Sequence, residues 1–148
     1  MKYYIIGLLL LSLAGCVSGK LYQFHGIDQT EKTMTVPVGS SYLLGPLKGE
    51  MQKAGWKLVI DGGPVVTRGR LGPDTDLQTG VTYRTKYRLA LNQVWLDKCT
   101  TGGDWLNFDL TVVDNDSGEE AMTMSGRDCT PWIMKTFMNA LNGKSPRI

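Results

Sequence analysis

The three cysteines, at positions 16, 99 and 129, are the residues of this chain with the widest choice of chemistry. Thiolates form disulfides, attack electrophiles and bind metals. A redox or zinc pair is typically spaced as CxxC, which Cys99 and Cys129 are not, and His25 is the only histidine. A zinc site would have to depend on scattered carboxylates, so we expect no metal and no cofactor.

Other side chains offer little for catalysis. No Gly-x-Ser-x-Gly elbow activates a serine, and His25 lies in an expected strand, where a histidine is typically solvated or hydrogen bonded. The carboxylates gather as Asp74 with Asp76 in an expected loop and as Glu119 with Glu120 beside a turn. A glycosidase needs two carboxyls about 5 to 10 Å apart, and loops also select acidic residues for solvation. We therefore expect no enzyme.

The run 114–118, Asp-Asn-Asp-Ser-Gly, has the composition of a calcium loop without its spacing. An EF-hand loop has Gly at its sixth position and a closing Glu at its twelfth. Here Gly118 comes one position early and Ser125 occupies the closing position. The run predicts a hairpin turn, and no phosphate-binding glycine pattern occurs elsewhere.

The amino terminus has the pattern of a processing segment. Lys2 precedes an apolar run over residues 5–13, which is too short to cross a hydrocarbon core of about 30 Å as a helix. The motif that follows, Leu13-Ala14-Gly15-Cys16, resembles the lipobox of bacterial lipoproteins. The resemblance implies that residues 1–15 are removed and that Cys16 carries acyl chains. The alternative is an ordinary secretory signal that happens to contain a cysteine.

The residue after Cys16 bears on location. In Gram-negative lipoproteins an Asp there typically retains the protein in the inner membrane, and this chain has Val17. The resemblance therefore implies a lipid-anchored protein of the outer membrane, on its periplasmic face. Residues 16–20 form a lipidated tether, in which four extended residues reach about 13 Å. We expect the folded domain to lie close to the bilayer.

Lipidation of Cys16 leaves Cys99 and Cys129 as an even pair in an oxidising compartment. A structural disulfide is then the expected state. It would close a loop of about 30 residues, worth roughly 3 to 4 kcal/mol on the chain-entropy model. A redox or metal pair is the functional alternative.

Periodicity predicts one domain over residues 21–143, followed by a tail at 144–148. The formal net charge is +2 with no basic run, so nucleic-acid binding is not expected. Alternation and turn residues predict strands at 21–25, 33–38, 56–60, 65–70, 81–96, 105–114 and 119–125, a loop at 69–80, and helices at 46–54 and 131–141. The expected fold class is α+β, a mostly antiparallel sheet covered on one face by two helices, with one disulfide.

Two local patterns resemble the small helix-on-sheet domains of envelope assembly proteins. A helix ends in Gly55-Trp56 before a strand, and Asp114, Gly118 and Glu119 mark a hairpin turn ahead of the closing helix. The resemblance covers most of the mature chain and transfers no functional residue.

Basic residues alternate along one expected strand. Arg84, Lys86 and Arg88 would share a face, with Arg68 and Arg70 on the neighbouring hairpin. Lipid phosphates or an acidic partner would suit this surface. The alternative is a solvated sheet face on which these cations pair with an aspartate across the strands, Asp109. The aromatic residues of the opposite face, Tyr83, Tyr87 and Trp95, are expected in the core rather than in a ligand platform.

These observations favour a non-enzymatic envelope lipoprotein that acts through protein contacts as an assembly or accessory subunit. Its expected partners are the membrane, through Cys16, and an envelope protein; the sequence indicates no oligomeric state. A surface inhibitor or exclusion factor against lysozyme or phage is the second hypothesis, with the loop at 69–80 inserted into a cleft. The third is an enzyme acting on glycan or lipid through Asp74 and Asp76.

Overall fold

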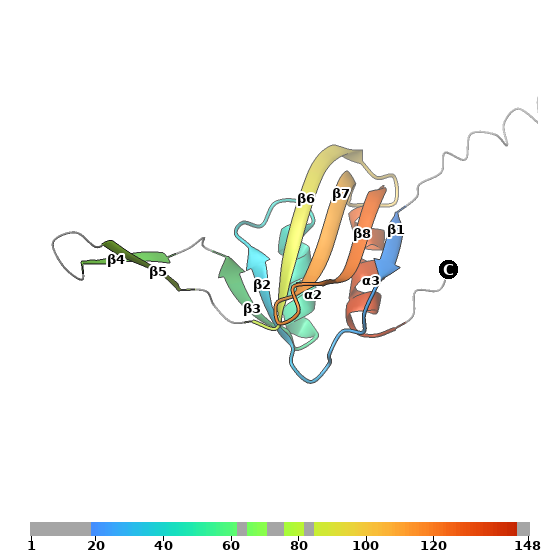
Figure 1. Ribbon diagram of the computed structural model, residues 1–148. Coiled ribbons are helices and arrows are strands. Elements are labelled where there is room, and N and C mark those ends of the chain that lie inside the picture. The colour runs from blue at the N-terminus through green and yellow to red at the C-terminus, as the bar shows by residue number, and fades with distance from the viewer. Residues whose placement is uncertain (1–18, 62–64, 71–75, 82–84, 145–148) are drawn as a thin grey trace, which may run out of the picture.

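The computed structural model describes residues 19–61, 65–70, 76–81 and 85–144, and describes side chains within 19–61 and 85–144. Its elements are β1 (Lys20–Gln23), β2 (Thr33–Pro37), α2 (Leu44–Lys53), β3 (Lys57–Asp61), β4 (Val65–Arg70), β5 (Asp76–Val81), β6 (Tyr87–Lys98), β7 (Asp104–Asp114), β8 (Glu120–Cys129) and α3 (Thr130–Leu141) (Figure 1). The α+β class and the disulfide are confirmed. The expected leader at 1–15 and residues 145–148 of the tail lie outside the described residues.

A six-stranded sheet with the order β1-β8-β7-β6-β2-β3 forms the centre of the fold. Its first four strands are antiparallel neighbours. The longest ladder joins β6 to β7, from Tyr87 opposite Asp114 to Lys98 opposite Asp104. These strands form where the sequence alternates, because every second side chain of a half-buried strand faces the core.

The other half of the sheet is parallel, so the expectation of a mostly antiparallel sheet is wrong. β2 pairs in parallel with both β3 and β6, which makes the sheet mixed. For β2 and β3 the reason is α2, because a helical crossover brings the chain back to begin a parallel neighbour. Gly55, at φ 86°, allows the chain to turn out of α2 directly into β3.

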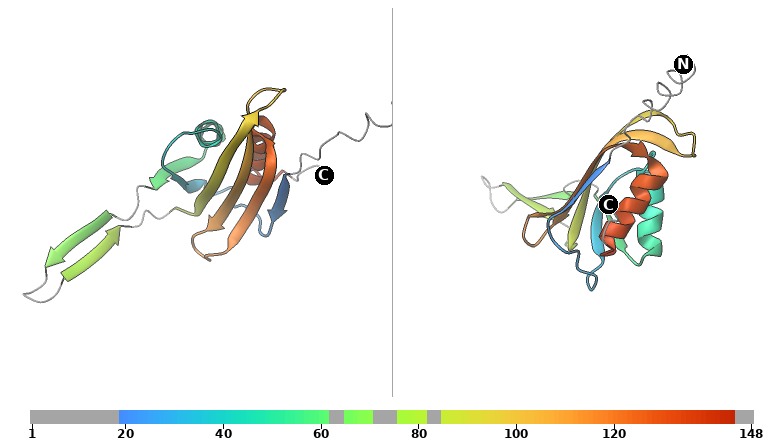
Figure 2. Two further views of the ribbon diagram at one scale, coloured as in Figure 1. Left: turned by 90° about the horizontal axis from the view of Figure 1, so that it is seen from above. Right: turned by 90° about the vertical axis from the view of Figure 1, so that its right-hand side faces the viewer.

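β4 pairs with β5 instead of β3, and the two form a separate two-stranded sheet. The register runs from Val65 opposite Val81 to Arg70 opposite Asp76. Two expectations are corrected here: residues 65–70 do not return along 56–60, and residues 76–80 of the expected loop form a strand together with Val81. Figures 1 and 2 show this hairpin lying outside the main sheet.

The core lies on one face of the sheet, which we call the buried face. Alternate residues of the strands supply it, together with apolar residues of both helices: Met34, Val36, Tyr87, Leu89, Leu106, Phe108, Leu110, Val112, Met122, Met124, Leu47, Met51, Ile133, Phe137 and Leu141. α3 contacts β7 and β8, and α2 contacts β3 and α3 (Figure 2). The opposite side of the sheet, which we call the open face, bears mostly polar residues.

Both helices begin one or two residues before the expected starts at 46 and 131. α3 begins at Thr130, so Cys129 is the residue at the cap position and Pro131 stands in the first turn. The hydroxyl of Thr130 accepts instead from the backbone N–H of Asp104, at 3.1 Å. Among the helices in the described ranges, we find none with the length and apolar character needed to cross a membrane.

Candidate interaction site

Several of the expected site residues lie outside the described parts of the chain. Cys16 and Arg84 are in this group, as are Asp74 and Tyr83. Arg68, Arg70 and Asp76 belong to the β4–β5 hairpin, and only their backbone positions are described. The structure therefore places the hairpin that bears these residues and leaves their chemistry as an expectation.

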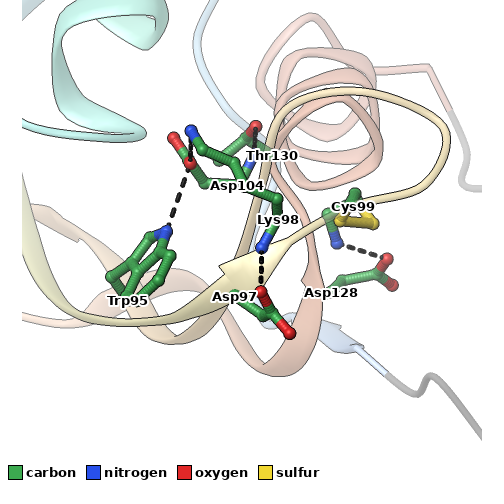
Figure 3. Close-up of a disulfide and its surroundings, with 8 residues drawn as sticks. Trp95, Asp97, Lys98, Cys99, Asp104, Asp128 and Thr130 are labelled. Atoms are coloured by element: carbon green, nitrogen blue, oxygen red, sulfur yellow. Dashed lines mark hydrogen bonds and ion pairs between the residues drawn. A yellow bond between two sulfur atoms is a disulfide. The ribbon is translucent and has the colours of Figure 1, made fainter.

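The expected disulfide is present and lies where β6 and β8 end. Cys99 and Cys129 are bonded, with their Cα atoms 6.0 Å apart (Figure 3). The bond joins the connection between β6 and β7 to the last residue of β8, which stands at the cap position of α3. The disulfide therefore links the end of one strand to the start of a helix, which is typical of a structural cross-link. The cysteine count predicted this bond.

A polar network beside the disulfide fixes the ends of β6 and β7. The carboxylate of Asp104 accepts from the ammonium of Lys98 and, at 3.2 Å, from the indole N–H of Trp95 (Figure 3). The hydrogen bond from Lys98 lowers the pKa of Asp104, with a smaller contribution from Trp95, against the opposing effect of burial. Asp104 is therefore ionised and structural at neutral pH.

Of the expected cationic stripe, the structure describes the side chains of Lys86 and Arg88. β6 begins at Tyr87, so Lys86 precedes the strand. The Lys86 ammonium lies 3.0 Å from Asp114 and 2.8 Å from Asp116, and their hydrogen bonds, that of Asp116 first, raise its pKa. Lys86 is thus engaged in an internal ion pair, and a basic surface would have to rely on Arg88 and the hairpin.

Among the described cations of the stripe, Arg88 lies away from Asp109, the aspartate of the alternative pairing. Asp109 lies opposite Asn92, whereas Arg88 lies opposite Val113, four residues further along β7. Both Arg88 and Asp109 are exposed on the open face. The two charges therefore stand several residues apart on the sheet, and neither neutralises the other.

His25 lies 3.2 Å from Glu119, in an exposed pair that joins the segment after β1 to the turn before β8. The carboxylate oxygen can accept a hydrogen bond from the imidazole, and both side chains are more than half exposed. No cluster of three or more His, Cys, Asp or Glu residues with metal-site geometry occurs within the described ranges. The pair has the features of a surface contact between strand ends.

Of the three aromatic residues expected on one face, Tyr83 lies outside the described residues, and the other two differ in burial. Tyr87 is buried, with its ring centroid 5.9 Å from that of Trp56, as expected for the core. Trp95 is on the same face of β6 but is 43% exposed, so the expectation of burial is wrong for it. The core does not extend to the end of β6, where Trp95 stands.

The open face carries a shallow polar depression that the sequence analysis did not identify. It has a volume of about 400 Å³ and includes Asn92, Asn107, Asp109 and Ser125, which lie on three adjacent strands. A signal for it lies in the alternation of 105–114, where the outward residues 107, 109 and 111 are polar. These amides and the carboxylate can donate and accept hydrogen bonds, although they form no pair suited to acid–base catalysis.

One carboxylate is buried away from the open face. Asp128 is 6% exposed, lies opposite Leu106, and accepts a hydrogen bond from the backbone N–H of Cys129 at 2.7 Å. Burial raises the pKa of Asp128, and the hydrogen bond from Cys129 only partly offsets the increase. The position was not singled out in the sequence because nothing local distinguishes Asp128 from a turn aspartate.

Comparisons with known proteins give the chain no family. No protein-family model matches it, and no curated protein matches it. Among solved structures, the chain aligns with a dodecamer of a PelC variant from Paraburkholderia phytofirmans at 12% sequence identity and a TM-score of 0.47, over 88% of this chain and 100% of that one. This likeness is too distant to support an argument about this protein.

Proposed function

We propose that the protein is a non-enzymatic lipoprotein of the bacterial outer membrane, anchored through Cys16 and acting through protein contacts as an assembly or accessory subunit. The lipobox and the paired cysteines support the location. The proposal includes the layer arrangement expected from the sequence, with both helices on one face of the sheet, because it leaves the open face and the hairpin for contacts.

The observation that carries the protein-contact function is the β4–β5 hairpin. Its two strands pair with each other and with no other strand of the described chain. A two-stranded hairpin is marginally stable on its own in water, and it gains independent stability from a third strand or a packed surface. A hairpin held outside the sheet is therefore suited to binding a partner that completes it.

Site-specific photo-crosslinking in native membranes tests this function. A photoreactive amino acid is placed in β4 at Thr67 or in β5 at Gln78, which lie near the centre of the ladder. The matched control carries it at Asp116, an exposed residue of the turn between β7 and β8. We expect one discrete crosslinked envelope protein from both hairpin positions and none from the control.

A hairpin deletion separates binding from folding. Residues 64–82 are replaced by a short Gly/Ser linker, which leaves the six-stranded sheet and the disulfide outside the deleted segment. The variant should keep its disulfide and its membrane fraction while losing the accessory phenotype. Absence of any discrete crosslink at both hairpin positions, in a protein that is folded and membrane-bound, would overturn the proposal.

The same hairpin gives the inhibitor hypothesis its structural basis, because a projecting hairpin can enter the cleft of an enzyme. This second candidate predicts that the purified protein inhibits lysozyme or protects cells from phage, and that the hairpin deletion removes the effect. Inhibition without a crosslinked envelope protein would favour the second candidate over the first.

A further inference from the structure

Exposed apolar side chains gather at one end of the main sheet. Gln93, Phe108 and Gly126 form a row across β6, β7 and β8. Six exposed apolar residues lie beyond this row or next to it, and we call the region that they form the tether end: Tyr42, Val94, Trp95, Leu96, Trp105 and Trp132. They are six of the ten large apolar side chains that are exposed in the described parts of the chain.

Two of these six are placed by contacts other than the strand register. Tyr42 follows Ser41, whose carbonyl accepts from the Gln93 amide at 2.8 Å, so it stands at the level of the row. Trp132 comes three residues after Cys129, which lies opposite Trp105. The end of the sheet, the start of α3 and the loop before α2 therefore meet at the tether end.

Trp132 also contacts the point at which the described chain begins. A Cβ atom built on Gly19 would lie 2.7 Å from Cζ3 of Trp132 and 3.5 Å from Cζ of Phe108. The indole ring therefore packs directly on the glycine backbone, and a side chain at position 19 would require the ring to move. Trp132 nevertheless keeps 41% of its surface exposed.

The length of the tether fixes how far this contact can be from the membrane. Cys16 and Gly19 are separated by two residues, so their Cα atoms are at most about 11 Å apart. The headgroup layer of a bilayer is itself about 5 to 8 Å deep on each side. With acyl chains on Cys16, the Gly19 backbone and the Trp132 ring lie within or just outside that layer.

We propose that the tether end docks on the lipid bilayer, with Trp132 in the headgroup region. This inference rests on the lipid anchor of the proposed function. Indole rings favour the membrane interface because one edge is apolar and the N–H remains hydrated. Lys135 is exposed three residues after Trp132 on α3, and Lys20 and Arg127 are exposed on β1 and β8 within one residue of the row. Cations near a bilayer favour anionic headgroups.

Docking at this end gives the domain one orientation. The acyl chains of Cys16 hold the protein on the bilayer, but a tether alone leaves the domain free to turn about it. The contact of Trp132 with the headgroups is a second point of attachment, and the packing of Trp132 on Gly19 keeps it close to the first. The turn between β7 and β8, at the opposite end of the β7 ladder, then faces away from the bilayer.

Tryptophan quenching in vesicles tests the docking. The lipidated full-length protein is reconstituted in vesicles of phosphatidylethanolamine and phosphatidylglycerol, with or without bromine on the acyl chains near the headgroups. Trp95→Phe with Trp105→Phe leaves Trp132 and the buried Trp56 as emitters. We expect brominated vesicles to cause a loss of emission, and Trp132→Phe in the same background to abolish that loss.

Every other outcome overturns the docking, and the mass of the protein and its sedimentation show which explanation applies. Unchanged emission in a protein whose mass shows acyl chains on Cys16 overturns the docking and leaves the anchor intact. Unchanged emission together with dimers in sedimentation means that a second copy of the chain covers the tether end. A Cys16 without acyl chains removes both anchor and docking, whereas the hairpin crosslinks test the protein-contact function separately.

Discussion

The ammonium of Lys86 lies 3.0 Å from the carboxylate of Asp114, and this ion pair ties the residue before β6 to the last residue of β7. Asn115 strengthens the connection, because its backbone N–H donates to the Lys86 carbonyl at 2.9 Å and its side chain donates to the Thr85 carbonyl at 2.8 Å. The turn between β7 and β8 is therefore fastened to the start of β6 by both charge and hydrogen bonds.

Replacing Lys86 by methionine should destabilise the fold more than replacing Arg88 by methionine. Lys86→Met keeps the aliphatic stem but leaves Asp114, a partly buried carboxylate, without its cation. Arg88 is exposed on the neighbouring strand position and is the matched control. Urea unfolding at neutral pH measures both; an equal loss in the two variants would mean that the ion pair contributes nothing beyond a surface charge.

The same ion pair predicts that the stability of the fold falls at both acidic and alkaline pH. Burial raises the pKa of Asp114, but the backbone hydrogen bond from Asp116 and the contact with Lys86 outweigh it and lower the pKa below 3.8. Its stabilising contribution is present above that ordinary value and is lost as the pH falls through the lower, folded value. The pKa of Lys86 is raised above 10.5, so its contribution is present below that value and lost at more alkaline pH.

Asp114→Asn should therefore flatten the acid side of the stability curve. The free energy of unfolding of the wild type should fall between mildly acidic and strongly acidic pH more steeply than that of the variant. Unfolding by urea over this range, with Asp109→Asn as the exposed control, measures the difference. Parallel curves for the wild type and Asp114→Asn would contradict the assignment.

Removal of the disulfide should cost about 3 to 4 kcal/mol, because it closes a loop of roughly 30 residues in the unfolded chain. Cys99→Ala with Cys129→Ala should lower the free energy of unfolding by this amount under oxidising conditions. A reductant should have the same effect on the wild type and none on the double variant. An active redox pair would instead change oxidation state at mild potentials without unfolding the domain.

The parts of the fold that the sequence predicted are those whose signals are local. β7 alternates Leu106, Phe108, Leu110 with polar residues, and this pattern alone defines its buried face. Partner choice is not local: residues 61–64, Asp-Gly-Gly-Pro, have the composition of a hairpin turn, yet β3 pairs with β2 through the α2 crossover. The mixed sheet and the β4–β5 hairpin were missed for this reason.

At the candidate site, too, the sequence predicted what depends on local signals and missed what depends on pairing between distant segments. The cysteine count predicted the disulfide, whereas no local signal shows that Lys86 meets carboxylates at positions 114 and 116 in a turn two strands later along the chain. Trp95 satisfies the alternation of β6, but its exposure depends on how far the core extends along the strand. The gathering of apolar residues at the tether end likewise depends on strand register, which period-2 patterns do not give.

Tyr87→Phe should destabilise the domain by about 0.5 to 1.5 kcal/mol, the usual net value of one hydrogen bond. The phenol oxygen of Tyr87 accepts from the backbone N–H of Asp28 at 2.8 Å, and the ring itself is buried. The variant keeps the ring and its contact with Trp56 while leaving this donor to water. Thermal unfolding measures the effect; a loss several times larger would indicate that the ring had moved.

Asp128→Asn should stabilise the domain at neutral pH, and the gain should disappear in acid. Because burial raises the pKa of Asp128, the folded state binds a proton more tightly than the unfolded state does. Stability from this group is therefore highest when it is protonated and falls as the pH rises from 3.8, the ordinary value, through the raised, folded value. Asparagine is neutral at every pH and keeps an oxygen for the Cys129 N–H.

The measurement is the difference in the free energy of unfolding between Asp128→Asn and the wild type, followed from acidic to neutral pH. The difference should grow in favour of the variant across this range and then level off, the reverse of the trend expected for Asp114→Asn. Asp109→Asn, on the open face, is the control and should show no such trend. A variant less stable than the wild type at neutral pH would mean that the ionised carboxylate has a stabilising partner in the folded protein.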